Sequence, residues 1–268
     1  MNKHPKVNPP QTDARQVDER VRADLESIGL GAVSLVALDQ LDASLSQQIL
    51  NTLHGKGLDE PLDRIRLLLI GNTGGDFWRE AGSGAYSTAD PIDDFSTTRV
   101  TEIVSRHLEE KDFLILYPGD CGFSLQRLGL AAGFGVPSWL GIDIHPEFGT
   151  WFAYRVVIAM VQDLPITSTA KLGDICANCR GHECLMACPV DAPGEVGHFD
   201  LNACVDFRLT DDSPCALTCV ARENCPVGQE FRYGADLLAH VYGRSLGSIR
   251  RWRAASQVTE PTRDDSAD

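Results

Sequence analysis

Apolar residues follow two different spacings along the first two-thirds of the chain. Some runs are almost continuously apolar, as buried strands are, and they span residues 64–70, 113–117 and 151–161, with a β-rich run at 32–38. Other segments repeat apolar residues every three or four positions, which predicts helices over 17–28, 41–57, 90–108 and 124–132. Strands that alternate with helices predict a mixed α+β core over about residues 20–165.

Local signals mark several helix ends, and the pattern changes after residue 165. Pro91 stands where the first turn of a helix is expected, and Gly29 and Gly133 follow expected helix ends. Periodicity is lost beyond Pro165–Asp174 and returns as a helical pattern over 229–253. We therefore expect a disordered lead over 1–15, a folded domain over 16–166, a loop-rich domain over 167–254 and a disordered acidic tail over 255–268.

Composition and charge narrow the partners and the compartment. The chain has 268 residues, of which 43% are apolar, and this composition excludes wholesale disorder. The net charge of −14 repels phosphate backbones, so a nucleic-acid partner is not expected without a localised basic patch. No apolar stretch has the length of a membrane span, and the polar, Pro-rich first residues show no signal peptide. We therefore expect a cytoplasmic protein without a membrane partner.

The cysteines are distributed very unevenly. Of nine cysteines, eight lie between Cys176 and Cys225, and only Cys121 stands apart. An extracellular scaffold would spread its disulfides along the chain, whereas clustered thiols in a reducing compartment are available as metal ligands. The skew therefore predicts bound metal in the loop-rich domain.

The cysteine spacing is close to that of two-cluster bacterial ferredoxins, in which C-x2-C-x2-C-x3-C-P sends its fourth cysteine to the other cluster. Here the order is Cys176-x2-Cys179-x4-Cys184-x3-Cys188-Pro189, then Cys204-x10-Cys215-x3-Cys219-x5-Cys225-Pro226. By the same crossing of ligands, one [4Fe–4S] cluster is predicted on Cys176, Cys179, Cys184 and Cys225. The other is predicted on Cys188, Cys204, Cys215 and Cys219.

Three other arrangements of these thiols remain open. The gap between Cys179 and Cys184 is two residues longer than in the ferredoxin motif. Two structural zinc sites, disulfides, or one cluster with spare thiols are therefore alternatives. His182 and His198 are expected to be solvated loop residues, and Cys121 a small buried residue.

Two motifs before the cysteines resemble known families. The segment 132–141 (AGFGVPSWLG), the segment 144–155 (IHPEFGTWFAYR) and the turn 163–165 (DLP) resemble epoxyqueuosine reductases and, more distantly, corrinoid reductive dehalogenases. With residues 90–93 (DPID), the first domain resembles the CblC-type cobalamin-processing chaperones even more closely. The resemblance implies an α+β, nitroreductase-like corrinoid-binding domain, followed by the ferredoxin-like domain.

The resemblance also suggests residues for the corrinoid site. It places His145, Gly149 and Arg155 around the corrinoid, with Trp151 as an aromatic residue of the cofactor pocket, and Asp120 as the nearest match to a proton-donating acid. Each of these residues has a purely structural alternative. His145 could be a turn residue, Trp151 a core residue, and Asp120 a turn residue or an N-cap. Arg155 is costly to bury in an apolar strand without an anion or an acid beside it.

These observations lead to one functional hypothesis with named rivals. The chain is expected to be an iron–sulfur oxidoreductase that passes electrons from an external donor through two [4Fe–4S] clusters to cobalamin, as cofactor or as substrate. Rivals are an epoxyqueuosine reductase-like enzyme and a ferredoxin-like electron carrier without a substrate of its own. Flavin is the weaker alternative cofactor. Ile142-Asp143 replaces the Lys-Asn of the queuosine enzymes, and the net charge of −14 argues against tRNA as substrate.

Overall fold

We analysed a computed structural model of the chain, which describes residues 14–86, 88–108, 113–161, 172–194 and 198–258. These residues form two compact units, and neither is a continuous stretch of chain. The first unit contains the described residues of 14–72, 84–134 and 154–161, and the second those of 73–83, 135–153 and 172–258. No helix in the described part of the chain has the length and apolarity needed to span a membrane.

A four-stranded sheet forms the centre of the first unit. Its strand order is β1 (Ala32–Ala37), β2 (Ile65–Thr73), β6 (Phe152–Val161) and β3 (Phe113–Tyr117). β1 pairs antiparallel with β2, and β3 pairs antiparallel with β6. Residues 65–72 of β2 are all buried, as the continuous apolar run predicts for a strand covered on both faces.

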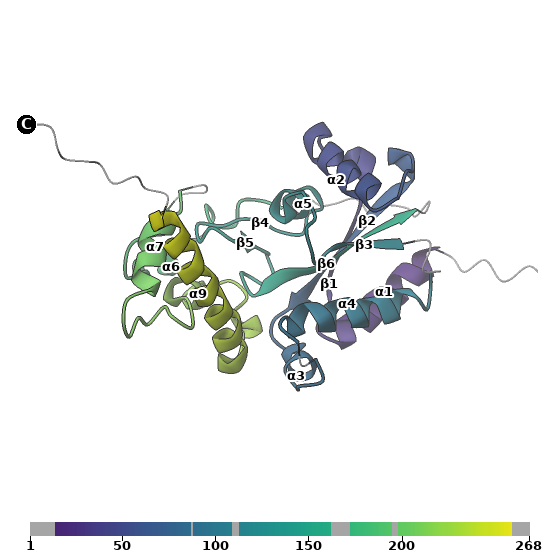
Figure 1. Ribbon diagram of the computed structural model, residues 1–268. Coiled ribbons are helices and arrows are strands. Elements are labelled where there is room, and N and C mark those ends of the chain that lie inside the picture. The colour runs from purple at the N-terminus through teal and green to yellow at the C-terminus, as the bar shows by residue number, and fades with distance from the viewer. Residues whose placement is uncertain (1–13, 87, 109–112, 162–171, 195–197, 259–268) are drawn as a thin grey trace, which may run out of the picture. The chain divides into compact units, whose positions relative to one another are not determined.

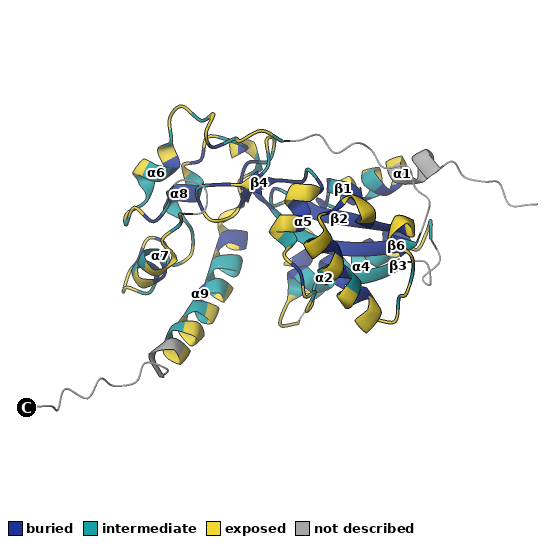
Figure 2. Ribbon diagram, turned by 90° about the horizontal axis from the view of Figure 1, so that it is seen from above, coloured by how far each residue is buried: buried dark blue, intermediate teal, exposed yellow. Residues whose placement is uncertain are grey.

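Helices cover both faces of this sheet. α2 (Ala43–Gly55) lies on one face, and α1 (Ala14–Ser27) and α4 (Pro91–Val104) lie together on the other (Figure 1). The short α5 (Leu125–Ala131) and the single 3₁₀ turns η1 (Leu38–Gln40) and η2 (Leu62–Arg64) complete the unit. Figure 2 shows buried strands and helices whose outer faces are exposed. The mixed α+β class predicted for this core is confirmed.

Capping contacts mark the ends of several predicted helices. The side chain of Asp42 accepts a hydrogen bond from the backbone N–H of Leu45, and Ser124 accepts one from Arg127. Ser124, and not Asp120, is therefore the N-cap of α5. Gly29 ends α1 with a φ of 77°, a left-handed conformation that favours glycine.

The second unit consists mainly of loops and short helices. Residues 73–83 contribute α3 (Trp78–Ala81), and residues 135–153 contribute a two-stranded ribbon of β4 (Val136–Pro137) and β5 (Asp143–Ile144). The cysteine-rich segment contributes α6 (Glu183–Ala187), α7 (Leu201–Arg208), α8 (Val220–Glu223) and the 3₁₀ turn η4 (Gln229–Phe231). The long helix α9 (Ala235–Val258) follows.

The sequence pattern missed these short helices and misplaced two boundaries. α7 begins where the Asp200 carboxylate accepts a hydrogen bond from Ala203, and α8 begins where the Cys219 sulfur accepts one from Arg222. Such caps hold helices that are too short for a periodic apolar face. α1 already begins at Ala14 and α9 extends to Val258, so the expected lead and tail are shorter than predicted; their remaining residues, 1–13 and 259–268, lie outside the described chain. The predicted boundary at 166–167 also lies outside it.

Candidate metal centre

Four thiols of the second unit interact around α7 and α8. Cys188 follows α6, Cys204 lies within α7, Cys215 lies in the loop after α7, and Cys219 caps α8. Electrostatic interactions join Cys204 to Cys219, Cys188 and Cys215. We call these four residues the second thiol group.

The remaining four thiols of the cysteine-rich segment form a separate group. Cys176 and Cys179 share a tight turn, closed by a 3.1 Å hydrogen bond from the Cys179 N–H to the Cys176 carbonyl. Cys184 lies in α6 and interacts electrostatically with Cys225, Cys176 and Cys179. We call these four residues the first thiol group. The two groups have the membership that the ferredoxin-like crossing of ligands predicts, and their binding of clusters stays a prediction.

Burial raises the pKa of five of these thiols, those of Cys176, Cys184, Cys204, Cys219 and Cys225. Desolvation raises the pKa of Cys184 and that of Cys204 to about 11. Backbone N–H groups act in the other direction at several sulfurs, with those of Trp139 and Val227 lowering the pKa of Cys176 and Cys225 respectively. Because thiolates are the form that binds metal, uptake of metal by these groups must release protons.

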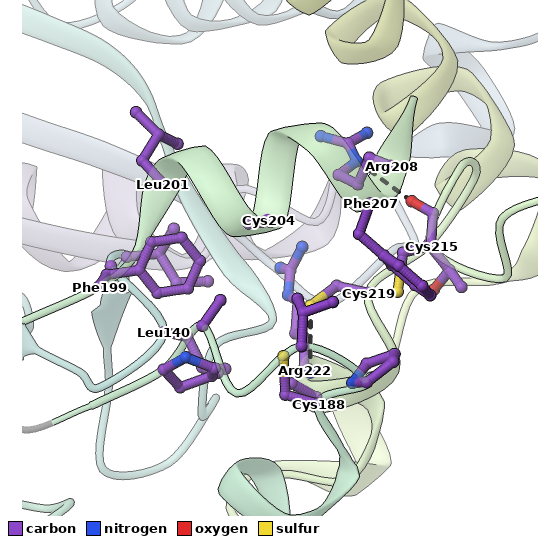
Figure 3. A pocket seen from close by; sticks show the side chains of 18 of the residues that line it. Leu140, Cys188, Phe199, Leu201, Cys204, Phe207, Arg208, Cys215, Cys219 and Arg222 are labelled. Carbon is purple, nitrogen blue, oxygen red and sulfur yellow. Dashed lines mark hydrogen bonds between the residues drawn. The ribbon is translucent and has the colours of Figure 1, made fainter. Parts of the chain in front are cut away.

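An apolar cavity of about 270 Å³ lies among the four sulfurs of the second thiol group. Figure 3 shows the side chains around it, with Leu140 and Phe199 facing α7 and two arginines close to the cysteines. The lining contains all four cysteines together with apolar residues and the polar side chains of Arg208, Thr218, Arg222 and Tyr242. The cavity therefore offers four sulfur ligands in largely apolar surroundings.

Apolar contacts place the two thiol groups next to each other. Val136 and Ile144 pack with Cys176 and Cys225 of the first group. Leu140 and Ala221 pack with Cys184 of the first group and also contact Cys188 and Cys219 of the second. Centres bound at the two groups would therefore share a wall, which is the arrangement that electron transfer between them requires.

Several buried polar atoms near the thiols have no hydrogen-bond partner. Nε of Arg222 and Oγ1 of Thr218, which line the cavity, are buried without a partner among the described residues, and so is Nε2 of His182. An unsatisfied buried donor costs about 1–3 kcal/mol, so such atoms indicate a place where a ligand would accept hydrogen bonds. The sulfur atoms of an iron–sulfur cluster are acceptors of the required kind, and the donor set therefore fits such a cluster.

The thiols do not converge on a single point. Among the residues that the structure describes, no three His, Cys, Asp or Glu side chains form a group that could hold one metal ion. A mononuclear zinc site needs four ligand atoms about 2.3 Å from one metal for its sulfur ligands. The thiols are grouped, but they are not in that geometry.

His145 is held in a tight turn of the second unit. Its backbone N–H and carbonyl pair with those of Gly149, and its Nδ1 accepts hydrogen bonds from the N–H groups of Glu147 and Phe148. The imidazole stacks on the Phe148 ring at 4.3 Å between centroids. Nδ1 is thus occupied by the turn, and Nε2 is the nitrogen that remains for a ligand.

Replacing Gly149 by alanine is expected to destabilise the second unit by roughly 3 kcal/mol. Gly149 has a φ of 58°, and an added Cβ would lie 2.0 Å from the Val227 carbonyl oxygen. Gly84→Ala is the matched control, because Gly84 also has a positive φ, 87°, but an added Cβ would meet nothing within 4 Å. Urea unfolding should show a clearly larger loss for Gly149→Ala; equal losses would mean that the 227–228 backbone can move away.

Acidification is expected to remove a contribution of His145 to stability. Burial lowers the pKa of His145 to about 4 from its ordinary value of 6.5. The unfolded chain therefore binds the proton more readily, and this contribution is complete above pH 6.5 and is lost as pH falls towards 4. The free energy of unfolding of the wild type should fall by about 2 kcal/mol more than that of His145→Gln between pH 8 and pH 5. Parallel pH profiles would contradict this account.

The other residues implicated in corrinoid binding have different environments. Trp151 belongs to the second unit and is fully buried; the Arg222 guanidinium lies 4.4 Å from its ring centroid, and Tyr233 packs edge-on at 5.5 Å. Arg155 belongs to the first unit, where its Nε donates a 2.7 Å hydrogen bond to Oδ1 of the buried Asn72. Trp151 thus supports the core of its unit, and Arg155 has a neutral partner on β2.

Polar groups gather near Arg155 in the first unit. The pKa of the half-buried Tyr117 is raised by burial and by the charge of Asp93, and lowered by Arg155, while Cys121 raises it further. The Cys121 thiol also donates a 3.4 Å hydrogen bond to the Phe123 carbonyl. Asp120 is exposed and makes no hydrogen bond to any residue in the described ranges. Sequence reasoning did not assign Tyr117 to this site, although it ends a strand just before Pro118-Gly119.

Sequence reasoning also missed three polar residues of the metal centre: Arg208, Thr218 and Arg222. Arg208 lies one helical turn after Cys204 in α7, and Arg222 lies three residues after Cys219 in α8. Helical spacing places both side chains near their cysteines, but only once α7 and α8 are known to be helices. Between Cys176 and Cys225 the sequence contains only three arginines, Arg180, Arg208 and Arg222. This scarcity of cations beside eight thiols is the sequence signal that could have drawn attention to Arg208 and Arg222.

Comparison with known proteins supports the fold assignment. No protein-family model matches the chain, and no curated protein sequence matches it. Among solved structures, epoxyqueuosine reductase from Bacillus subtilis is 16% identical, with 83% of this chain and 68% of that chain covered and a TM-score of 0.51. The C. elegans B12-trafficking protein CblC is 14% identical over 89% of this chain and 96% of that one, with a TM-score of 0.47. A reductive dehalogenase is 14% identical over 93% of this chain and 38% of that one, also with a TM-score of 0.47. The chain therefore shares its fold with epoxyqueuosine reductase over most of its length.

Proposed function

We propose that this protein is an iron–sulfur oxidoreductase whose second unit binds two [4Fe–4S] clusters in a ferredoxin-like arrangement. The observation that carries the proposal is the division of eight thiols into two adjacent groups of four, one of them around an apolar cavity with unpaired hydrogen-bond donors. Cys176, Cys179, Cys184 and Cys225 would bind one cluster, and Cys188, Cys204, Cys215 and Cys219 the other. Such thiols stay reduced in the cytoplasm, which is the location we propose.

The spread of the second thiol group favours a cluster over zinc. The four thiolates of a [4Fe–4S] cluster bind four different irons, so their sulfurs stand around a volume and not around a point. A zinc ion would instead draw four sulfurs into one coordination sphere. The second thiol group surrounds a cavity of about 270 Å³, and no described group converges on a single ion. This geometry supports iron–sulfur clusters as the bound groups.

We further propose that the clusters supply electrons to a corrinoid. When bound, the clusters transfer single electrons, and the corrinoid supplies the reductive chemistry at cobalt. Arg155 and His145 are the residues of this chain proposed to bind the corrinoid, with Gly149 and Trp151 supporting the turn and the core beside His145. The exposed carboxylate of Asp120 is the proposed proton donor.

Titration of the anaerobic protein with cobalamin tests this proposal. We expect Arg155→Ala to weaken binding at least tenfold, which corresponds to the loss of about 1.4 kcal/mol from a charge-assisted contact. The control is Arg64→Ala, which removes an exposed arginine of the first unit whose partner is Glu60. Arg155→Lys should recover part of the affinity. Unchanged cobalamin affinity in folded Arg155→Ala and in His145→Ala would contradict the corrinoid proposal, and would favour an electron carrier without its own substrate.

The second candidate is an epoxyqueuosine reductase-like activity. The shared fold favours it, because the solved structure with the highest TM-score reported above belongs to an epoxyqueuosine reductase. The net charge of −14 favours a substrate other than nucleic acid. Incubation of the reduced protein with an epoxyqueuosine-modified tRNA stem loop separates the two candidates: conversion of the modified base would establish the second, and unconverted RNA with tight cobalamin binding would establish the first.

A further inference from the structure

The cavity at the second thiol group is lined by two arginines besides its four cysteines. Among the residues that line it, Arg208 and Arg222 carry positive charge, and no carboxylate is present. Each arginine is only 9% exposed. Both approach the cysteines from the helices that carry Cys204 and Cys219 (Figure 3). The cavity is thus positively charged apart from its thiols.

Neutral groups hold the Arg208 side chain. Its Nε donates to the Cys215 carbonyl at 3.1 Å, and its terminal nitrogens donate to the carbonyls of Ala216 and Tyr242 and to the Ser245 hydroxyl. None of these acceptors carries charge. Hydrogen bonding fixes the orientation of the guanidinium but leaves its positive charge without a counter-ion among the described residues.

Arg222 has neutral and aromatic partners only. It donates to the Thr150 carbonyl and, at 3.5 Å, to the Tyr242 hydroxyl. Its guanidinium carbon lies 4.4 Å from the centroid of Trp151 and 4.9 Å from that of Tyr233. Its Nε is buried without a hydrogen-bond partner. This second cation is therefore fixed beside the cavity with one N–H still unused.

Two buried cations in one cavity are unfavourable unless an anion lies between them. Removing a charge from water costs several kcal/mol after relaxation, and like charges in a shared low-dielectric cavity repel each other. Arg208 and Arg222 line the same cavity as the four cysteines, so metal-bound thiolates of this group are the anion that would lie between them. A thiolate-ligated cluster is negatively charged, and one further negative charge is added on reduction.

The first thiol group has different electrostatic surroundings. Asp174 interacts with Cys176, and Glu183 interacts with Cys225, where the exposed Arg232 acts in the opposite direction. Arg208 and Arg222, in contrast, line the cavity of the second thiol group. Carboxylates beside a cluster disfavour the additional electron, whereas buried cations favour it.

We propose that Arg208 and Arg222 are the counter-charges of the cluster bound by Cys188, Cys204, Cys215 and Cys219, and that they raise its reduction potential above that of the other cluster. The inference rests on the proposed function, since it requires both clusters. An electron shared by the two clusters then resides at the second thiol group. The two arginines act through the cluster and are positioning residues.

A potentiometric titration of the anaerobic protein tests the inference, with dithionite as reductant and the electron paramagnetic resonance of each cluster as readout. We expect two midpoint potentials, of which the higher belongs to the signal altered by Cys219→Ser. Arg222→Gln and Arg208→Gln should each lower that midpoint, changing the ratio of reduced to oxidised cluster at least tenfold at a fixed potential, or about 59 mV. Lysine at either position should retain most of the potential. Arg250→Gln, which removes an exposed arginine of α9, should leave both midpoints unchanged.

The outcomes separate failure of this inference from failure of the proposed function. Full iron content with unchanged midpoints in both glutamine variants overturns the inference alone. Assignment of the lower midpoint to the Cys219 signal also overturns it, and that measurement needs no arginine variant to fold. A protein that takes up neither iron nor sulfide overturns the proposed function, and this inference with it.

Discussion

Replacing Cys219 by alanine is expected to remove about half of the protein's iron and acid-labile sulfide, from about eight of each per chain to about four. Cys219 interacts electrostatically with Cys215 and Cys188 of the second thiol group. Its loss therefore deprives one cluster of a ligand. Cys184 and its three neighbours still provide four ligands for the other cluster.

The matched control for this experiment is Cys121→Ala. Cys121 belongs to the first unit, where its thiol donates to the Phe123 carbonyl, and it should contribute no ligand. Iron and sulfide analysis of anaerobically purified variants measures both results. Complete loss of iron in Cys219→Ala would mean that the groups assemble only together, and unchanged iron would remove Cys219 from the ligand set.

Removal of the clusters is expected to unfold the second unit while the first unit stays folded. Cysteines stand inside both small apolar clusters of the second unit, where Cys176 and Cys225 pack with Val136 and Ile144 and where Cys184 packs with Leu140. Without ligated metal, the raised pKa of these thiols favours their neutral form. Neutral thiols do not compensate the positive charges of the two buried arginines, so this core is destabilised. Comparable structural metal sites contribute on the order of 10 kcal/mol to folding.

Tryptophan fluorescence isolates this effect, because all four tryptophans, Trp78, Trp139, Trp151 and Trp252, belong to the second unit. After treatment with acid and a chelator and return to neutral pH, we expect no cooperative fluorescence transition in urea. Far-ultraviolet circular dichroism should still show a transition from the sheet and helices of the first unit. Readdition of iron and sulfide under reducing conditions should restore the fluorescence transition; a fully cooperative fluorescence transition in the metal-free protein would contradict the account.

The sheet of the first unit could be predicted from the sequence because its strands are buried along their length. Residues 64–70, 113–117 and 151–161 are continuous apolar runs, and they correspond to β2, β3 and β6. Helix ends could be predicted where a capping residue or a glycine stands beside the periodic stretch, as at Asp42, Gly29 and Ser124. In each case the signal lies within a few residues of the feature that it predicts.

The division into units could not be predicted, because it depends on contacts between distant parts of the chain. Residues 135–153 follow the first unit in sequence, yet they belong to the second. Val136, Leu140 and Ile144 are ordinary apolar residues in the sequence, and only the structure shows that they pack against cysteines 32 or more positions away. A periodicity of three or four residues predicts local secondary structure, and it does not predict contacts between residues so far apart in the sequence.

The candidate site was predictable only in part, for a related reason. Thiol spacing predicts metal ligands directly, since few other roles require eight clustered cysteines. The charges that surround those ligands come from Arg208 and Arg222, which a sequence pattern does not distinguish from surface arginines. Their burial and their neutral partners appear only once α7, α8 and α9 are in place.

The most direct test of the central claim is the metal content of the protein purified without oxygen. Iron, acid-labile sulfide and zinc should be measured together on the same sample, with the visible absorption spectrum. The account predicts a brown protein with about eight iron and eight sulfide per chain and no stoichiometric zinc. A colourless protein with two zinc ions and no sulfide would contradict it, and so would a metal-free protein with its thiols paired in disulfides.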